Sequence, residues 1–176
     1  MKIMKFGGTS VGKPERMHHV AKLVTAGNEE TIVVLSALSG TTNALVEIGT
    51  SMSQGNREQA KQQIDALHKH YNEFITSLVK KEQSIENAKQ ILNEHFEFLT
   101  IILKISFSES LNKDILAQGE LLSTKLFSIY LDEQGIDHML LTALEFMTID
   151  ANDEPHIGAI KGKLSQLLLQ KKKKKL

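Results

Sequence analysis

Residues 5–12 read Lys5-Phe6-Gly7-Gly8-Thr9-Ser10-Val11-Gly12, and this stretch decides the fold. It lies between a short apolar run and a helical pattern that opens at Pro14, an order that predicts a strand, a glycine turn and a helix. Adjacent glycines let backbone N–H groups approach an anion closely, the two hydroxyls add donors, and the helix N-terminus adds partial positive charge. Lys5 contributes a full charge beside them. We therefore expect a phosphate-binding site here.

A P-loop is the first alternative, because Gly7, Gly12 and Lys13 satisfy the G-x-x-x-x-G-K spacing. Position 14 is Pro, however, where a P-loop has the Ser or Thr that binds magnesium. Pro14 instead suits the first turn of a helix, where its missing N–H is not required. A second alternative is that the two glycines form only a tight turn, and residues 5–12 by themselves leave that alternative open.

The sequence after this turn predicts an α/β fold with a parallel sheet. A helical pattern begins after Pro14 and stops at Gly27-Asn28, and residues 31–38 form an apolar, β-branched run that is typical of a strand buried on both faces. The order strand, helix, strand is a βαβ unit. Because ligands of such sheets bind beyond the carboxyl ends of the strands, we expect residues 5–12 and 36–43 to face a common crevice.

Helical patterns dominate the rest of the chain. A first helix follows Thr41 or Thr42 as its N-cap and breaks at Gly55-Asn56, and residues 57–79 and 84–106 form a helical hairpin. Another long helix runs from Leu111 to a stop at Gly135. Residues 138–141 read as a short strand and residues 157–169 as a weak helix. We expect one domain over residues 1–169 and a lysine-rich tail over residues 170–176.

The composition excludes several classes of protein. Lys plus Arg equals Asp plus Glu at 21 each, so no net field attracts nucleic acid or a membrane surface. The chain has no cysteine, no signal peptide and no run of membrane-spanning length, so we expect a soluble cytoplasmic protein. The seven histidines lack the spacing of a helical zinc pair, and we predict no metal site in the protein itself.

The chain resembles the aspartate kinases of the amino-acid kinase superfamily at three motifs in the same order: residues 5–10, residues 33–43 and residues 119–123. This resemblance implies the N-terminal lobe of a three-layer αβα amino-acid kinase fold, which is carbamate kinase-like, with a parallel-sheet core and several long helices. It implies ATP-dependent phosphorylation of the side-chain carboxylate of L-aspartate to 4-phospho-L-aspartate, with Mg²⁺ as cofactor. That reaction opens lysine, threonine and methionine biosynthesis.

The resemblance also assigns roles to residues. Lys5 is the expected catalytic residue and contacts the phosphates of ATP, and the rest of the ATP site is formed by Phe6, Gly7, Gly8 and Thr9. Glu120 matches the glutamate that binds the substrate ammonium group, and Ser36 and Thr42 match the hydroxyl donors to aspartate. Taken alone, Glu120 reads as a surface carboxylate and Thr42 as a helix N-cap. Ser39 and Thr41 lie in the same loop, so the sequence leaves the exact hydroxyls open.

One departure from the family concerns the activity of this chain. Aspartate kinases carry an Arg-Gly-Gly-Ser-Asp motif and a nucleotide-binding half further along, and here arginine occurs only at Arg16 and Arg57. We therefore expect an aspartate-binding lobe that is inactive alone and that forms a homo-oligomer. Two alternatives remain: a non-catalytic dimerisation or interaction fragment, and another amino-acid kinase that acts on acetylglutamate, glutamate or UMP.

Overall fold

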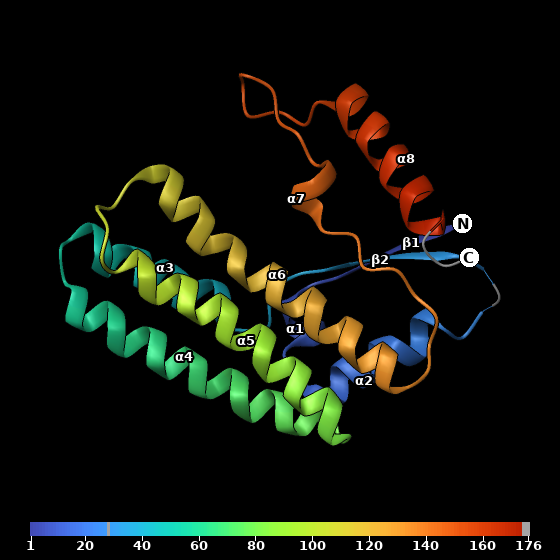
Figure 1. Ribbon diagram of the computed structural model, residues 1–176, viewed down its shortest axis with the longest axis horizontal. Coiled ribbons are helices and arrows are strands. Elements are labelled where there is room, and N and C mark those ends of the chain that lie inside the picture. Colours follow the sequence, from blue (N-terminus) through green and yellow to red (C-terminus); the bar gives the residue numbers. More distant parts are fainter. Residues whose placement is uncertain (28, 174–176) are drawn as a thin grey trace. The chain divides into compact units, whose positions relative to one another are not determined.

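The computed structural model describes residues 1–27 and 29–173, and for residues 171–173 it describes the backbone alone. The chain divides into two compact units, Met1–Asp137 and His138–Leu176. Figure 1 shows the elements of the first unit, which are β1 (Lys2–Phe6), α1 (Gly8–Val11), α2 (Pro14–Val24), β2 (Thr31–Leu35), α3 (Thr41–Ser53), α4 (Arg57–Leu78), α5 (Glu82–Ile102) and α6 (Glu109–Glu133). The second unit contains α7 (Ala143–Phe146) and α8 (Ile157–Lys173).

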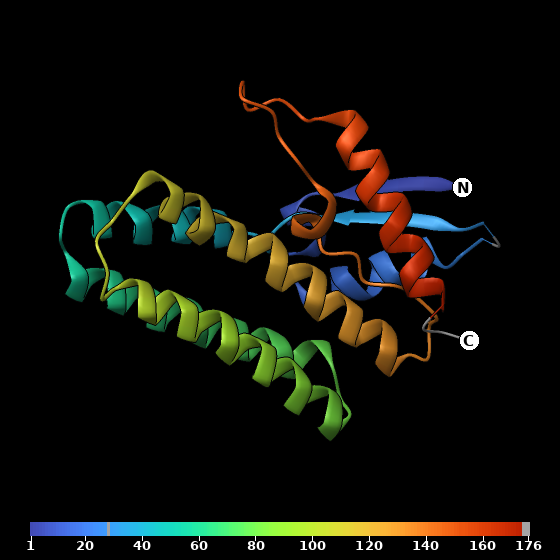
Figure 2. The same ribbon diagram turned by 45° about the horizontal axis from the view of Figure 1, so that its top comes forward.

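β1 and β2 form a two-stranded parallel sheet, as the sequence predicts. The register runs from Lys2 opposite Thr31 to Phe6 opposite Leu35. Figure 2 shows the two strands side by side with α2 on one side of them. The strand, turn and helix predicted around residues 5–12 are therefore confirmed, with the four-residue helix α1 inserted in the turn.

Only one face of this sheet is buried. Val33 and Phe6 pack against the hydrophobic core, and Leu35 is buried within it. On the other face, Ile32 is 36% exposed and Val34 is 45% exposed. The prediction that this strand is buried on both faces is wrong, because a continuous apolar run does not reveal whether a second layer covers the sheet.

Helices α3, α4, α5 and α6 pack against one another as a bundle in both ribbon views (Figures 1 and 2). Buried side chains recur three and four residues apart along each helix, so each presents one apolar stripe to the others. The stripe of α4 contains Ala60, Ile64, Leu67, Tyr71, Phe74, Ile75 and Leu78. The predicted hairpin of residues 57–79 and 84–106 is confirmed as α4 and α5.

The end of α6 holds the turn of this hairpin. The Glu133 carboxylate is buried and accepts hydrogen bonds from the backbone N–H groups of Lys80 at 3.0 Å and Lys81 at 2.8 Å. Lys81 Nζ donates to the Glu133 carbonyl oxygen at 2.8 Å. Burial alone raises the pKa of Glu133, but these backbone donors, the Ser84 side chain and the Lys81 charge outweigh it and lower that pKa overall.

A second buried polar contact joins α5 to α6. The imidazole of His95 donates from Nδ1 to Gln118 Oε1 at 2.6 Å, and its Nε2 accepts from Lys125 Nζ at 2.8 Å. This pairing requires the neutral ring with its proton on Nδ1. Burial lowers the pKa of His95 below its ordinary value of 6.5, and the nearby Lys125 charge lowers it further. The hydrogen bond to Gln118 acts in the opposite direction but does not outweigh them.

Glycines with positive φ mark the helix ends. Gly55 (φ 77°) follows α3 and Gly135 (φ 69°) follows α6, which confirms both predicted stops. Gly40 (φ 84°) is the N-cap of α3, so the prediction of Thr41 or Thr42 at that position is wrong. Helix α2 ends at Val24, before the predicted stop at Gly27, and Asn28 lies outside the described residues.

The second unit differs from the prediction at its start. Residues 138–141 form no strand in the described part of the chain, because a four-residue apolar run becomes a strand only where an edge pairs with it. An isolated antiparallel bridge joins Ile149 to Pro155 instead. The weak helix is confirmed as α8, and residues 174–176 of the lysine-rich tail lie outside the described residues. The single domain over residues 1–169 stays a prediction.

No helix of the described residues combines the length and apolar character that crossing a membrane requires.

Candidate functional site

The motifs of residues 5–10 and 33–43 meet where the two strands end. Ser36 N donates a hydrogen bond to the Phe6 carbonyl oxygen at 3.0 Å, which continues the parallel pairing by one residue. Phe6 itself is half-buried against the core. The two loops that follow the strands therefore lie together at the carboxyl edge of the sheet, as expected for a ligand site in a parallel sheet.

Two glycines allow the first loop to pack against the second. A Cβ atom at Gly8 would lie 2.9 Å from the carbonyl oxygen of Ala37, and one at Gly12 would collide with Ser39 Cβ. The packing of Gly8 and Gly12 explains why the turn needs glycine there, while Gly7 and Thr9 remain exposed, so the choice between a tight turn alone and a binding site stays open. The carbonyl of Thr9 accepts a hydrogen bond from Arg16 Nη1 at 2.7 Å.

The third motif reaches the same place from α6. Ala37 N donates a hydrogen bond to Glu120 Oε1 at 3.3 Å. The close approach depends on Gly119, because a Cβ there would lie 2.7 Å from Ala37 Cβ and 3.1 Å from Thr41 Cγ2. Glu120 is exposed, so its carboxylate stays accessible to a cationic group.

Residues 36–42, which we call the hydroxyl loop, carry hydroxyl groups that differ in their exposure to solvent. Thr42 is exposed and Ser36 is half-buried, whereas Thr41 is 1% exposed. Thr41 Oγ1 is already bonded to the Tyr71 hydroxyl at 3.0 Å. Of the two neighbouring threonines, Thr42 is therefore the one available to a ligand.

Lys5 lies on the exposed face of β1, opposite Val34 in the register. Among the described residues, no hydrogen bond or ion pair holds its ammonium group. It stands one residue before Phe6, whose carbonyl joins the two loops. Lys5 thus presents an unpaired cation on the strand that leads into the first loop, and no hydrogen bond joins it to Glu120 among the described residues.

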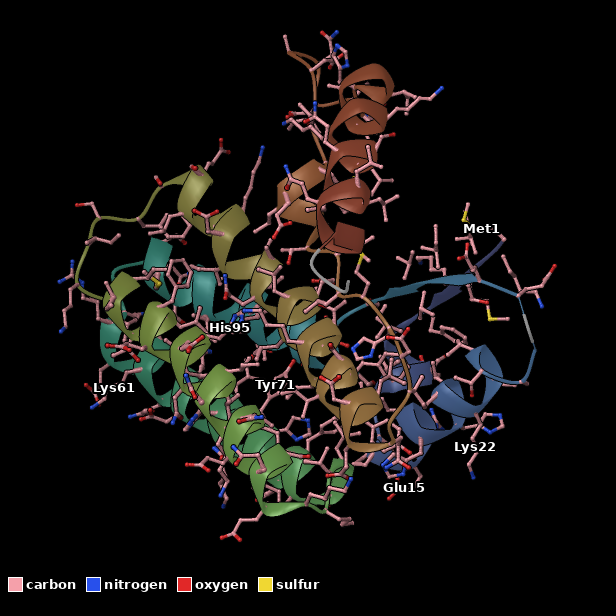
Figure 3. The ribbon with its side chains drawn as sticks, turned by 45° about the vertical axis from the view of Figure 1, so that its right-hand side comes forward. Met1, Glu15, Lys22, Lys61, Tyr71 and His95 are labelled. Atoms are coloured by element: carbon pink, nitrogen blue, oxygen red, sulfur yellow. The ribbon has the colours of Figure 1, made fainter. Side chains whose placement is uncertain are left out.

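Sequence reasoning assigned no role to Tyr71, which lies within the predicted helix of residues 57–79. Tyr71 is fully buried, and Figure 3 shows it inside the bundle, whereas Lys61 and Lys22 point outward. Burial raises the pKa of Tyr71 well above its ordinary value, an effect that the bond to Thr41 reduces and the nearby charge of Glu120 increases. One signal was available, because a buried tyrosine hydroxyl normally requires a partner.

Two further observations concern the polar side chains of this region. The described residues contain no cluster of three histidine, cysteine or acidic side chains that could hold a metal ion. Ser123 Oγ, one turn after Gly119, is buried without a hydrogen-bond partner among them.

Residues 1–174 match the sequence profile of the Amino acid kinase family. The chain belongs to the amino acid kinase family. It is 33% identical over 158 residues to Aspartokinase 3, chloroplastic, of Arabidopsis thaliana, a match that covers 86% of this chain and 27% of the relative. It is 28% identical over 161 residues to Lysine-sensitive aspartokinase 3 of Escherichia coli (strain K12), covering 90% of this chain and 35% of that protein.

A solved structure gives the same assignment. The crystal structure of E. coli aspartokinase III in complex with aspartate and ADP superimposes with a TM-score of 0.79 at 26% identity, covering 97% of this chain and 38% of that one. The predicted amino-acid kinase fold and family are therefore confirmed. The chain spans about a quarter to about two fifths of the length of these relatives.

Proposed function

We propose that this chain is the aspartate-binding part of an aspartate kinase, an enzyme that transfers a phosphoryl group from ATP to the side-chain carboxylate of L-aspartate. The observation that carries the proposal is the bond between Ala37 N and Glu120 Oε1, which brings an accessible carboxylate to the hydroxyl loop. The similarity to aspartokinases supports it.

Each residue of the site binds a different group of the substrate. The Glu120 carboxylate pairs with the α-ammonium group of aspartate, and the hydroxyls of Ser36 and Thr42 donate to its carboxylates. A β-carboxylate oxygen then bonds to the γ-phosphorus of ATP as the bond from phosphorus to the ADP oxygen breaks. Such a transfer depends on charge neutralisation and alignment more than on covalent catalysis.

Lys5 supplies the neutralising charge in this proposal. Its ammonium has no competing partner among the described residues, so it can contact the transferring phosphoryl oxygens. Residues Phe6, Gly7, Gly8 and Thr9 form the adjoining part of the ATP site. Mg²⁺ would be held mainly by the phosphates of ATP, because the described residues offer no cluster of three acidic, histidine or cysteine side chains.

A titration of the 176-residue chain tests the binding role. Added L-aspartate should shift the amide NMR signals of Ala37, Thr42 and Glu120, whereas succinate, which lacks the ammonium group, should bind more weakly. Glu120→Gln should weaken aspartate binding by about tenfold or more, because it removes the charge that pairs with the ammonium. Glu97→Gln, at an exposed carboxylate of α5, is the matched control. Equal binding of aspartate and succinate would refute the assigned role of Glu120.

The chain alone should not turn over, since it lacks the Arg-Gly-Gly-Ser-Asp motif and spans only part of its relatives. A coupled assay for ADP release measures this directly. Aspartate-dependent turnover in the ordinary range for kinases, about 1–100 s⁻¹, would contradict the proposal of an inactive part.

A non-catalytic interaction role is the second candidate, and the exposed sheet face favours it. Ile3 is 67% exposed beside Ile32 and Val34, and β1 and β2 each have one unpaired edge among the described residues. Exposed apolar strands pair readily with other chains, so we propose a homo-oligomer.

The absence of cysteine fits a reducing compartment such as the cytoplasm.

A further inference from the structure

Two side-chain hydrogen bonds join α3 to α4, one at each end of α3. At the end that carries the hydroxyl loop, Thr41 Oγ1 pairs with the Tyr71 hydroxyl at 3.0 Å. Near the far end, Ser51 Oγ donates to Gln63 Oε1 at 2.9 Å. Both Thr41 and Ser51 are buried, at 1% and 4% exposure, but Gln63 is half-buried, so the second bond is only partly buried.

Thr41 is fixed from several directions. Its N–H donates to the Leu38 carbonyl oxygen at 3.0 Å, which closes the turn of the hydroxyl loop. Its methyl group faces Gly119 on α6, where an added Cβ would lie 3.1 Å from Thr41 Cγ2. The hydrogen bond to the Tyr71 hydroxyl fixes the orientation of its Oγ1 atom.

Tyr71 is itself held rigidly. Its ring is fully buried and lies 6.1 Å from the ring of Phe96, centroid to centroid, at an interplanar angle of 60°. Its high pKa keeps the hydroxyl protonated at neutral pH, so it remains able to donate to Thr41. The ring thus offers a fixed hydrogen-bonding group to the first residue of α3.

We propose that Tyr71 is a positioning residue, which through Thr41 sets the conformation of the hydroxyl loop and the placement of the Ser36 and Thr42 hydroxyls. The link to aspartate rests on the function proposed above. Tyr71 touches no substrate in this scheme. It acts from α4, a helix outside the three motifs, because Thr41 and Thr42 are consecutive residues at the start of α3.

Amide hydrogen exchange in the full 176-residue chain tests this role without requiring activity. Tyr71→Phe removes one oxygen atom and leaves Thr41 Oγ1 buried without its partner. We expect the amides of Thr41 and Ala37 to exchange about tenfold faster than in the unaltered chain. Ser51→Ala breaks the other hydrogen bond between α3 and α4 and should leave exchange in residues 36–42 within about twofold of the unaltered chain, since distant sites act independently.

Two Thr41 variants keep the test decisive if Tyr71→Phe fails to fold. Thr41→Val removes the hydroxyl while preserving the shape of the side chain, and should accelerate Ala37 exchange as Tyr71→Phe does. Thr41→Ser retains the hydroxyl and should restore slow exchange. Equal loop exchange in the Tyr71→Phe and Ser51→Ala chains, or equal exchange in the Thr41→Val and Thr41→Ser chains, would overturn the inference.

An aspartate titration of the same variants separates the two proposals. If aspartate binds, Tyr71→Phe should raise its dissociation constant by about tenfold and Ser51→Ala should leave it unchanged. If aspartate fails to bind even the unaltered chain, the proposed function of this chain is refuted. The exchange data still decide the role of Tyr71 in that case, because they need no ligand.

Discussion

Replacing Glu133 should destabilise the first unit more than replacing any exposed carboxylate. Its buried carboxylate accepts from Lys80 N and Lys81 N and so holds the turn between α4 and α5. A hydrogen bond to a charged group contributes about 1.5–3 kcal/mol to stability. Part of that energy is regained when Glu133 is replaced, because the freed N–H groups can bind water. We expect Glu133→Gln, which keeps one acceptor oxygen, to cost about 1–2 kcal/mol, and Glu133→Ala to cost about 2–3 kcal/mol.

The pH dependence of this loss follows from the pKa of Glu133. The folded chain holds that pKa below its ordinary value of 4.5, so the unfolded chain binds the proton more tightly. The stabilisation is fully present above about pH 4.5 and is lost as the pH falls through the lower folded pKa. The difference between the unaltered chain and Glu133→Gln should therefore shrink on acidification.

Urea unfolding followed by circular dichroism measures both effects. At neutral pH the midpoint of Glu133→Gln should fall by about 0.5–1 M, given the usual urea dependence for a chain of this size. Glu86→Gln, at an exposed carboxylate on α5, serves as the control. A midpoint for Glu133→Gln equal to that of the control, or a difference that grows below pH 4.5, would refute the reasoning.

Three further results are expected. Gly119→Ala should lower the free energy of unfolding, measured by thermal unfolding, by about 1–3 kcal/mol, because the added Cβ would lie 2.7 Å from Ala37 Cβ. The control Gly162→Ala, whose added Cβ has no atom within 4 Å, should be neutral or stabilising. Equal effects of the two substitutions would contradict this prediction. His95 has a lowered pKa, so its contribution to folding stability is fully present above pH 6.5 and declines as the pH falls below that value. Stability measured from pH 7.5 to 5 should therefore drop less in His95→Gln, and an equal drop would exclude His95 as the source. Sedimentation at micromolar concentration should show self-association, and a clean monomer of 19.6 kDa would refute it.

Local pattern was sufficient for both strands and the long helices, although it wrongly predicted a strand at residues 138–141. The glycine turn after β1 and the apolar stripes of α4 and α5 depend on residues within a few positions of each other, and all were predictable. The proximity of residues 5–12 to the hydroxyl loop also followed, since parallel strands place their carboxyl ends together.

Long-range partners were beyond such reasoning. The bond from Tyr71 to Thr41 spans 30 residues and that from Lys81 to Glu133 spans 52, and neither leaves a local signature. The cap of α3 was misassigned because threonine is a common N-cap, whereas the backbone there needs positive φ and hence Gly40. The exposed face of β2 was missed because composition reports apolar character and not the layer that covers it.

The bond between Ala37 and Glu120 has a consequence for the order of folding. Its two residues are 83 positions apart, and α3, α4 and α5 lie between them along the chain. Loop closure over such a separation carries an entropic cost that local helix formation does not, so contacts of this kind form late. The helices can therefore acquire their secondary structure in microseconds while the carboxylate still lies far from the hydroxyls. In a refolding chain the Ala37 amide should be among the last to gain protection, which makes it a reporter of the moment when the site first exists.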